Sequence, residues 1–329
     1  MTHIVACIDV YDEAIVKETI RKFAPPGWEI RMASSYDQAQ QRTLIEGADI
    51  ILAGWAPIPS WMFESPTLRF VQKFGVGYDK IDITAARKHG TGVAIANGMN
   101  AVPVAELVLL FILALYRKLL YLDGTIRAGK WVKPEMRSKT YSLQGKTVGI
   151  LGFGFIGKEV AKRVQAFNAK VIYYDKFRRK PEEEAAANVR YVELDDLVAQ
   201  ADVVTLHMPS NAETRGLFDA KRMSKMKPTS LLINTARGEL VVANDLVSAL
   251  RNGKLMGAAL DVYEVEPVDP SSDLFKVDNL ILTPHVGGTV LDNVANMARH
   301  CFKNIELFLA GQPLPPGDVI VEAVPGVSQ

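Results

Sequence analysis

A glycine-rich turn that directly follows an apolar run constrains the fold of this 329-residue chain more than any other feature. The run covers Thr147–Leu151, and Gly152, Gly154 and Gly157 follow it at the spacing GxGxxG, with a helical pattern beyond. In such a strand–turn–helix unit, the first glycine takes the tight turn, the second admits a pyrophosphate and the third lets helix and strand pack closely. The N–H groups and the dipole at the helix start attract phosphate. The segment therefore predicts a doubly wound α/β fold that binds a dinucleotide.

Short apolar runs alternate with helical patterns along most of the chain. Strands separated by helices form parallel sheets, and runs that are apolar on both sides indicate sheets covered on both faces. We expect two such α/β blocks, with a long helix over Val102–Arg127 between them. A further helix over Thr289–Ala310 is expected to pack back on the first block. The predicted strands are Ile4–Asp9, Ile50–Ala53, Phe70–Lys73, Val93–Ala96, Thr147–Leu151, Lys170–Tyr174, Val203–His207, Ser230–Asn234, Gly257–Leu260 and Leu280–Thr283.

Composition narrows the class of protein. Hydrophobic residues make up 48% and charged residues 23%, which is typical of a globular protein with a sizeable core. The formal net charge of +1 gives no sign of a nucleic acid or a membrane surface as partner. Cys7 and Cys301 have no metal-ligand spacing, so we expect buried thiols, no metal and a reducing, cytoplasmic location. The longest apolar stretch, Ala105–Tyr116, is shorter than the ~20 residues that a membrane helix needs.

The strand after the glycine turn indicates which dinucleotide binds. Asp175 directly follows Lys170–Tyr174 and lies 18 residues beyond Gly157. An acidic residue about 20 residues beyond the glycine turn accepts hydrogen bonds from a ribose. A carboxylate there repels a 2′-phosphate, so the sequence favours NAD. Arg178 and Arg179 lie just beyond and are able to bind that phosphate, so an NADP-preferring reductase stays an alternative.

Two further polar residues follow predicted strands of the second block. Arg237 comes after Ser230–Asn234, and His285 comes after Leu280–Thr283. Ligands of open α/β sheets bind at the carboxyl ends of the strands. A guanidinium holds a carboxylate in a planar fork, and an imidazole exchanges a proton near neutral pH. Together they suit the reduction of a 2-keto acid, with Arg237 as the anchor and His285 as the proton donor.

The partner of His285 stays open from the residues alone. Asp261, Glu264 and Glu266 all lie in the segment DVYEVEP, and any one of them beside the ring would favour the imidazolium form and orient it. His207, after Val203–Leu206, is a rival base that ranks lower because no carboxylate motif accompanies it.

Several motifs in combination resemble those of the D-isomer-specific 2-hydroxyacid dehydrogenase family, over nearly the whole chain. They are GFGFIG at 152–157, NTARGE at 234–239, DVYEVEP at 261–267, TPHVGG at 283–288, FGVGYD at 74–79 and VAE at 104–106. The resemblance implies two doubly wound, Rossmann/flavodoxin-like domains with the active site in the cleft between them. It implies a substrate domain over 1–101 and 289–329, and an NAD-binding domain over 102–288.

The resemblance also assigns roles. It names Arg237, Glu266 and His285 as catalytic, and adds Val76 and Gly77 to Arg237 and His285 as the substrate-binding residues. Phe155 and Ile156 would lie along the pyrophosphate, Thr235 and Ala236 would border the nicotinamide, and Asp261 would hold its carboxamide. The full set of expected cofactor contacts is Gly152, Gly154, Phe155, Ile156, Gly157, Asp175, His207, Pro209, Thr214, Thr235, Ala236, Asp261, Gly287 and Gly288.

The expected function is hydride transfer between NAD and carbon 2 of a small D-2-hydroxy acid or 2-keto acid. Glyoxylate, hydroxypyruvate and 3-phosphoglycerate are candidate substrates, and the family implies a homodimer. The phosphite oxidisers of the family carry a lysine near position 76, where this chain has Val76. An NAD(H)-sensing protein similar to the family's corepressors, or an NADP-preferring glyoxylate/hydroxypyruvate reductase, is the alternative.

Overall fold

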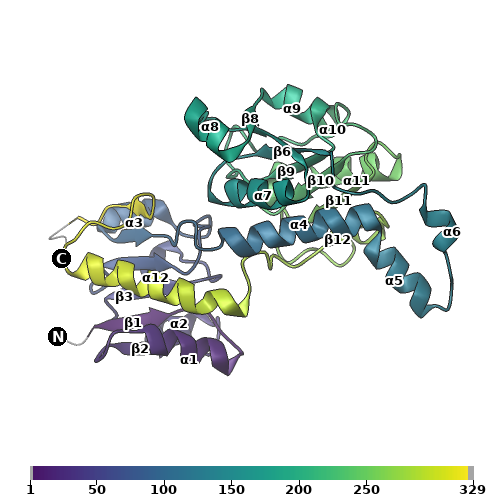
Figure 1. Ribbon diagram of the computed structural model, residues 1–329. Helices are drawn as coiled ribbons and strands as arrows, with labels where there is room; N and C mark the ends of the chain where they lie inside the picture. The colour runs from purple at the N-terminus through teal and green to yellow at the C-terminus, as the bar shows by residue number, and fades with distance from the viewer. Residues whose placement is uncertain (1–2, 325–329) are drawn as a thin grey trace. The chain divides into compact units, whose positions relative to one another are not determined.

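The computed structural model describes residues 3–324, which form two compact units (Figure 1). The chain up to Asn100 and again from Thr289 forms the first unit, and Ala101–Gly288 forms the second. Each unit contains one sheet, and each sheet has its own apolar clusters on its two faces.

The sheet of the first unit has the strand order β13-β5-β4-β3-β1-β2. Its strands are β1 (Ile4–Cys7), β2 (Glu29–Met32), β3 (Ile50–Ala53), β4 (Phe70–Lys73), β5 (Gly92–Ala94) and β13 (Val319–Val321). All pairs are parallel except β13 with β5. The helical segments are α1 (Ala14–Phe23), α2 (Gln38–Ile45), η1 (Ser60–Met62), α3 (Ile83–His89) and α12 (Leu291–Leu309). Helices α1 and α12 lie together on one face, where Ile20 and Phe302 pack with Val5 and Leu52.

The sheet of the second unit has the strand order β12-β11-β10-β9-β6-β7-β8, and every pair is parallel. Its strands are β6 (Thr147–Leu151), β7 (Lys170–Tyr174), β8 (Arg190–Tyr191), β9 (Val203–Leu206), β10 (Leu231–Asn234), β11 (Gly257–Leu260) and β12 (Leu280–Leu282). Its helical segments are α4 (Ala101–Arg117), α5 (Leu119–Arg127), α6 (Lys133–Met136), α7 (Phe155–Ala166), α8 (Pro181–Ala187), α9 (Leu194–Gln200), α10 (Ala220–Met223), η2 (Gly238–Leu240), α11 (Ala243–Arg251) and η3 (Asp273–Lys276).

The strand order of the second sheet reverses between β6 and β9, and this reversal positions the site. Helices α4 and α7 pack together over one face, and α9 and α11 belong to the cluster on the other. In open α/β sheets, ligands bind beyond the carboxyl ends of the strands at such a switch point. The glycine turn that follows β6 lies at that edge.

The predicted fold class is confirmed, because both sheets are doubly wound and the predicted strands recur with ends shifted by a few residues. Three strands were missed. Glu29–Met32 is a charged, partly exposed edge strand without an apolar run, and Arg190–Tyr191 is too short to carry a pattern. Val319–Val321 forms only by pairing antiparallel with β5. The first sheet is therefore mixed, whereas a parallel sheet was predicted.

The single helix expected over Val102–Arg127 is wrong. Helix α4 ends at Arg117, and Lys118 takes a left-handed conformation with φ 51° before α5 begins. Helix α4 has buried residues along its length, whereas α5 has none. Core packing therefore does not keep α5 in line with α4 as one continuous helix.

Cys7 and Cys301 are free thiols buried in the first unit, as predicted. Within residues 3–324, none of the helices combines the length and the apolar composition needed to cross a membrane.

Candidate active site

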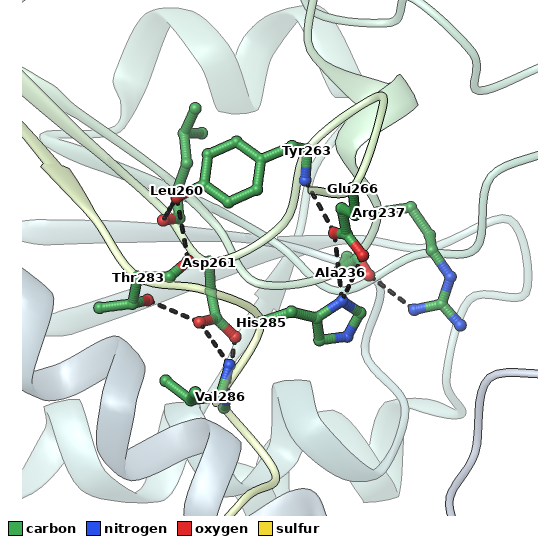
Figure 2. Close-up of polar contacts among 10 residues, drawn as sticks. Ala236, Arg237, Leu260, Asp261, Tyr263, Glu266, Thr283, His285 and Val286 are labelled. Atoms are coloured by element: carbon green, nitrogen blue, oxygen red, sulfur yellow. Dashed lines mark hydrogen bonds and ion pairs between the residues drawn. The ribbon is translucent and has the colours of Figure 1, made fainter. Parts of the chain in front are cut away.

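Three turns at the carboxyl edge of the second sheet carry the side chains singled out above. Strands β10, β11 and β12 are consecutive neighbours, so the segments that follow them emerge at one edge. Arg237 follows β10, Glu266 lies in the loop after β11, and His285 follows β12. Figure 2 shows the three side chains together in one region of the unit.

His285 and Glu266 form a direct pair. The imidazole Nδ1 lies 3.1 Å from Oε1 and 3.0 Å from Oε2 of Glu266. Because an ionised carboxylate only accepts, Nδ1 is assigned as the donor. The His285 side chain is 35% exposed and that of Glu266 17%, so the ring is reachable while the carboxylate is mostly covered. His285 has φ 55°, an uncommon conformation for a residue with a side chain, which strained turns at functional sites often hold.

The three acids that competed on sequence have different surroundings. Glu264 is exposed, and Glu266 meets the imidazole. Asp261 is 1% exposed and accepts hydrogen bonds from Thr283 Oγ1 at 2.6 Å and from the backbone N–H groups of Val286 at 2.9 Å and Gly287 at 2.8 Å. Asp261 therefore holds the turn around His285. The sequence predicted only a contact between Asp261 and the carboxamide of the nicotinamide, not this structural role.

The turn that carries Arg237 is shaped by its own backbone and by the loop after β11. Asn234 is fully buried, accepts from Ala236 N at 3.0 Å and donates to Arg237 O at 2.8 Å. The guanidinium Nη1 donates to Ala236 O at 2.6 Å. A Cβ at Gly238 would lie 1.9 Å from the carbonyl carbon of Tyr263, so this turn packs directly on the loop that leads to Glu266.

The glycine turn after β6 has the geometry of a phosphate cradle. Gly152 has φ +92°, and a Cβ there would lie 2.6 Å from His207 O. A Cβ at Gly157 would lie 2.3 Å from Gly152 O, whereas nothing lies within 4 Å of a Cβ at Gly154. Gly154 is the N-cap of α7, and no side chain caps that end. Space and open N–H groups therefore coincide where a pyrophosphate would lie.

Asp175 connects the glycine turn to the start of the loop after β7. Its carboxylate accepts from Phe153 N at 2.7 Å and from Phe177 N at 2.9 Å. Arg178 pairs with Glu184 at 2.8 Å, and that pairing lowers the pKa of Glu184. Arg179 donates to Phe153 O at 3.1 Å. Arg178 and Arg179 thus each have a partner within the unit, while Nε of Arg179 is buried without one.

Three buried polar atoms without a hydrogen-bond partner gather in loops expected to contact the cofactor: His207 Nδ1, Ser210 Oγ and Thr235 Oγ1. Buried polar groups are normally satisfied, so these atoms fit a bound dinucleotide that supplies their partners. His207 Nε2 lies 2.9 Å from Thr205 Oγ1. Burial lowers the pKa of His207 to about 3, so this ring is neutral at working pH and is a poor rival as proton donor.

The remaining predicted residues lie in four separate places. Thr214 donates to Pro209 O at 2.8 Å and so closes the loop after β9. Phe155, which is 57% exposed, and Ile156 lie at the start of α7. Gly287 is buried against Asp261 and precedes Gly288 in the turn after β12. Val76 and Gly77 belong to the first unit, in the turn after β4, and their contact with a substrate stays a prediction.

Two residues of these turns, Asn234 and Tyr263, were not predicted from the sequence. An asparagine that ends a strand before a turn is a known signal for a side chain that binds its own backbone, and it was available at Asn234. Tyr263 gave no such signal, because its contacts reach Glu266 and Thr283 only in the folded chain.

Comparisons with known proteins agree with this geometry. The family model described as D-isomer specific 2-hydroxyacid dehydrogenase, NAD binding domain, matches residues 109–287. A glyoxylate reductase of Thermococcus litoralis is 38% identical over 79% of this chain and 81% of its own length. A hydroxypyruvate reductase of Blautia hydrogenotrophica is 33% identical over 84% of this chain and 87% of its own length.

A solved structure gives the same result for the fold and the cofactor. The NAD-dependent formate dehydrogenase of Staphylococcus aureus, solved in complex with NAD, is 28% identical with a TM-score of 0.83, covering 98% of this chain and 100% of that chain. These matches agree with the family indicated by the strand–glycine–helix turn and by the residues that follow β10, β11 and β12. The chain belongs to the D-isomer specific 2-hydroxyacid dehydrogenase family and is an NAD-dependent oxidoreductase of that family.

Proposed function

We propose that this enzyme reduces a small 2-keto acid to the D-2-hydroxy acid, with glyoxylate and hydroxypyruvate as the first candidates. The His285–Glu266 pair at 3.0 Å, on turns neighbouring that of Arg237, is the observation that carries the proposal. The names of the similar glyoxylate and hydroxypyruvate reductases support this substrate class.

Arg237 is the proposed substrate anchor. Its guanidinium stays charged at any working pH and offers a planar fork to a carboxylate. Its position after β10 brings that charge to the carboxyl edge of the sheet, where it also polarises the keto oxygen. The backbone at Val76 and Gly77 of the first unit is proposed to bind the same carboxylate.

His285 is the proposed proton donor to the keto oxygen during reduction. Since Nδ1 is held by Glu266, Nε2 is the nitrogen assigned to exchange a proton with substrate. The carboxylate of Glu266 orients the ring for this proton transfer. In oxidation the same nitrogen accepts the proton.

The turn at Gly152–Gly157 and the loops after β9 and β10 are proposed to hold NAD. When bound, the nicotinamide supplies or accepts the hydride. Asp175 is the proposed partner of the adenosine ribose, and Thr235 and Ala236 are proposed to border the nicotinamide, with Asp261 at its carboxamide. On this assignment, residues 102–288 form the NAD-binding domain, which also carries Arg237 and His285, and residues 1–101 with 289–329 form the substrate domain.

A homodimer is also proposed. Large apolar side chains lie exposed along α4, α5 and the segment that follows, and a second copy would cover them: Leu110, Leu119, Leu120, Tyr121, Ile126 and Trp131. The free, buried thiols support a reducing compartment, and we propose the cytoplasm.

A keto-acid panel tests the reaction. Purified protein with NADH is assayed by absorbance against glyoxylate, hydroxypyruvate, pyruvate and bulkier 2-keto acids, and against NADPH as alternative donor. We expect oxidation of NADH with the smaller acids and a lower KM for NADH than for NADPH. Tight binding of NADH without turnover of any acid would overturn the proposal in favour of an NAD(H)-sensing protein.

Replacement of His285 tests the proton donor. We expect His285→Ala to lower kcat by roughly 10²- to 10⁴-fold, the usual loss for a general acid, with little change in the affinity for NADH. His89→Ala, in the first unit at the end of α3, is the matched control and should keep normal turnover. Normal turnover in His285→Ala would show that another group delivers the proton.

A further inference from the structure

One tyrosine, Tyr263, lies in the loop after β11 and contacts Glu266 in the same loop and Thr283 just beyond β12 (Figure 2). Its backbone N–H donates to Glu266 Oε1 at 3.0 Å. Its hydroxyl donates to the carbonyl of Thr283 at 2.9 Å and lies 3.3 Å from the carbonyl of Leu260. Its own backbone lies against Gly238, beside Arg237.

The carbonyl that this hydroxyl binds is the one that closes the histidine turn. His285 N donates to Thr283 O at 3.0 Å, and Thr283 N donates to Leu260 O at 3.0 Å. The hydroxyl of Tyr263 therefore lies between the last residue of β11 and the turn beyond β12. It ties the turn, on which His285 holds φ 55°, to the neighbouring strand.

The aromatic ring keeps this hydroxyl in place. Tyr263 is partly buried and packs against the apolar cluster that contains Leu260. Burial, together with the nearby charges of Asp261 and Glu266, raises the pKa of Tyr263 to about 12. The phenol therefore stays protonated and remains a donor throughout the pH range in which the enzyme works.

We propose that Tyr263 is a positioning residue, which sets the geometry of the His285–Glu266 pair through one hydroxyl and one backbone N–H. The hydroxyl holds the imidazole turn, and the N–H holds the carboxylate, so a single residue fixes both members of the pair. Asp261 binds the same turn from its other side, through Val286 and Gly287. This proposal rests on the proposed role of His285.

Tyr263→Phe removes the hydroxyl and leaves the ring and the backbone N–H. Loss of one hydrogen bond that orients a catalytic pair should lower kcat by roughly 3- to 10-fold. We expect changes of less than about 2-fold in the dissociation constant of NADH, measured by fluorescence, and in the KM for the keto acid. Such a split between kcat and binding is not expected if the hydroxyl only stabilises the fold.

Tyr116→Phe is the matched control. Tyr116 is a buried tyrosine of the same unit whose hydroxyl also faces a backbone carbonyl, that of Asp202 at 3.4 Å, away from the three turns. It should keep the kcat of the original enzyme. Equal losses in the two variants, or an unchanged kcat in Tyr263→Phe, would overturn the proposal.

A second measurement does not depend on turnover. The ring NMR signals of His285, identified by their disappearance in His285→Gln, should shift or broaden in Tyr263→Phe and stay in place in Tyr116→Phe. If the enzyme turned over no keto acid, the proposed function would fail while this comparison still decided whether Tyr263 positions the ring. Unchanged His285 signals in Tyr263→Phe would contradict the proposal directly.

Discussion

Two histidines follow strands of the second sheet, and their different surroundings support the different roles proposed for them. His207 comes after β9, where its ring has only Thr205 beside one nitrogen, and burial lowers its pKa to about 3. His285 comes after β12, where Glu266 binds Nδ1 and the side chain is 35% exposed. An imidazole that exchanges protons needs access and a partner for its charged form, and only the second site offers both.

The buried ring of His207 predicts a pH dependence of stability. The unfolded chain binds a proton at His207 below about pH 6.5, but the folded chain does so only near its lowered pKa of about 3. The unfolded state therefore holds more protons between these values, and the free energy of unfolding falls as the pH falls through this window. The contribution of His207 is on the order of 1 kcal/mol per pH unit.

Urea unfolding of the original protein and of His207→Gln at pH 7, 6, 5 and 4.5 measures this effect. We expect the free energy of unfolding to fall less steeply with acid in the variant. The comparison removes the contributions of other groups, which the two proteins share. Parallel pH dependences would contradict the neutral, buried state of His207.

At the level of single elements, the three glycines of the turn between β6 and α7 serve different purposes. The fold itself requires Gly152 and Gly157, because a Cβ at either position would clash with backbone atoms. It does not require Gly154, because the φ of −81° there is ordinary and nothing lies within 4 Å of a Cβ at that position. The proposed approach of a pyrophosphate would explain why the residue at this position lacks a side chain.

Gly154→Ala should therefore separate folding from cofactor binding. We expect a normal melting temperature, and an affinity for NADH weakened about 5- to 150-fold, as for a steric cost of roughly 1–3 kcal/mol. Gly157→Ala is the contrasting variant and should lower the melting temperature and the yield of folded protein. Thermal melts measure the melting temperature of each variant, and fluorescence titrations measure its affinity for NADH. Unchanged NADH affinity in Gly154→Ala would contradict the proposal that the pyrophosphate binds at this turn.

At the scale of the whole molecule, apolar surface remains on the helical segments α4 and α5. Leu120 is 62% exposed and Ile126 54%, and α5 has no buried residue. Side chains of this size grouped on adjoining helices are typical of a surface that another protein chain covers. A symmetric second copy is the simplest partner, because the same surface serves both chains.

Leu120→Glu tests the homodimer. We expect the original protein to have the mass of a dimer by light scattering at micromolar concentration, and the variant to dissociate because a charge would be buried in the interface. Ile15→Glu, at an exposed apolar residue of α1, should leave the dimer intact. A monomeric original protein, or an unaffected dimer in Leu120→Glu, would contradict the proposed interface.

Features that depend on neighbours along the chain could be predicted from the amino-acid sequence. The pattern of a strand, three spaced glycines and a helix is local, since the steric freedom of glycine and the helix dipole act within a few residues. The apolar runs likewise determined most strands. Arg237 and His285 were identified because each directly follows such a run.

Features that depend on contacts between distant segments became known only from the folded chain. From the residues alone, Asp261, Glu264 and Glu266 were competing candidates, and only the folded chain brings Glu266 to the imidazole. The same fold turns Asp261 to the backbone at Val286 and Gly287. Strand β13 exists because it pairs with β5, and the hydroxyl of Tyr263 has a partner because β11 and β12 are neighbours. Hydrogen bonds and burial are set by the distance between atoms in space, which a linear pattern does not contain.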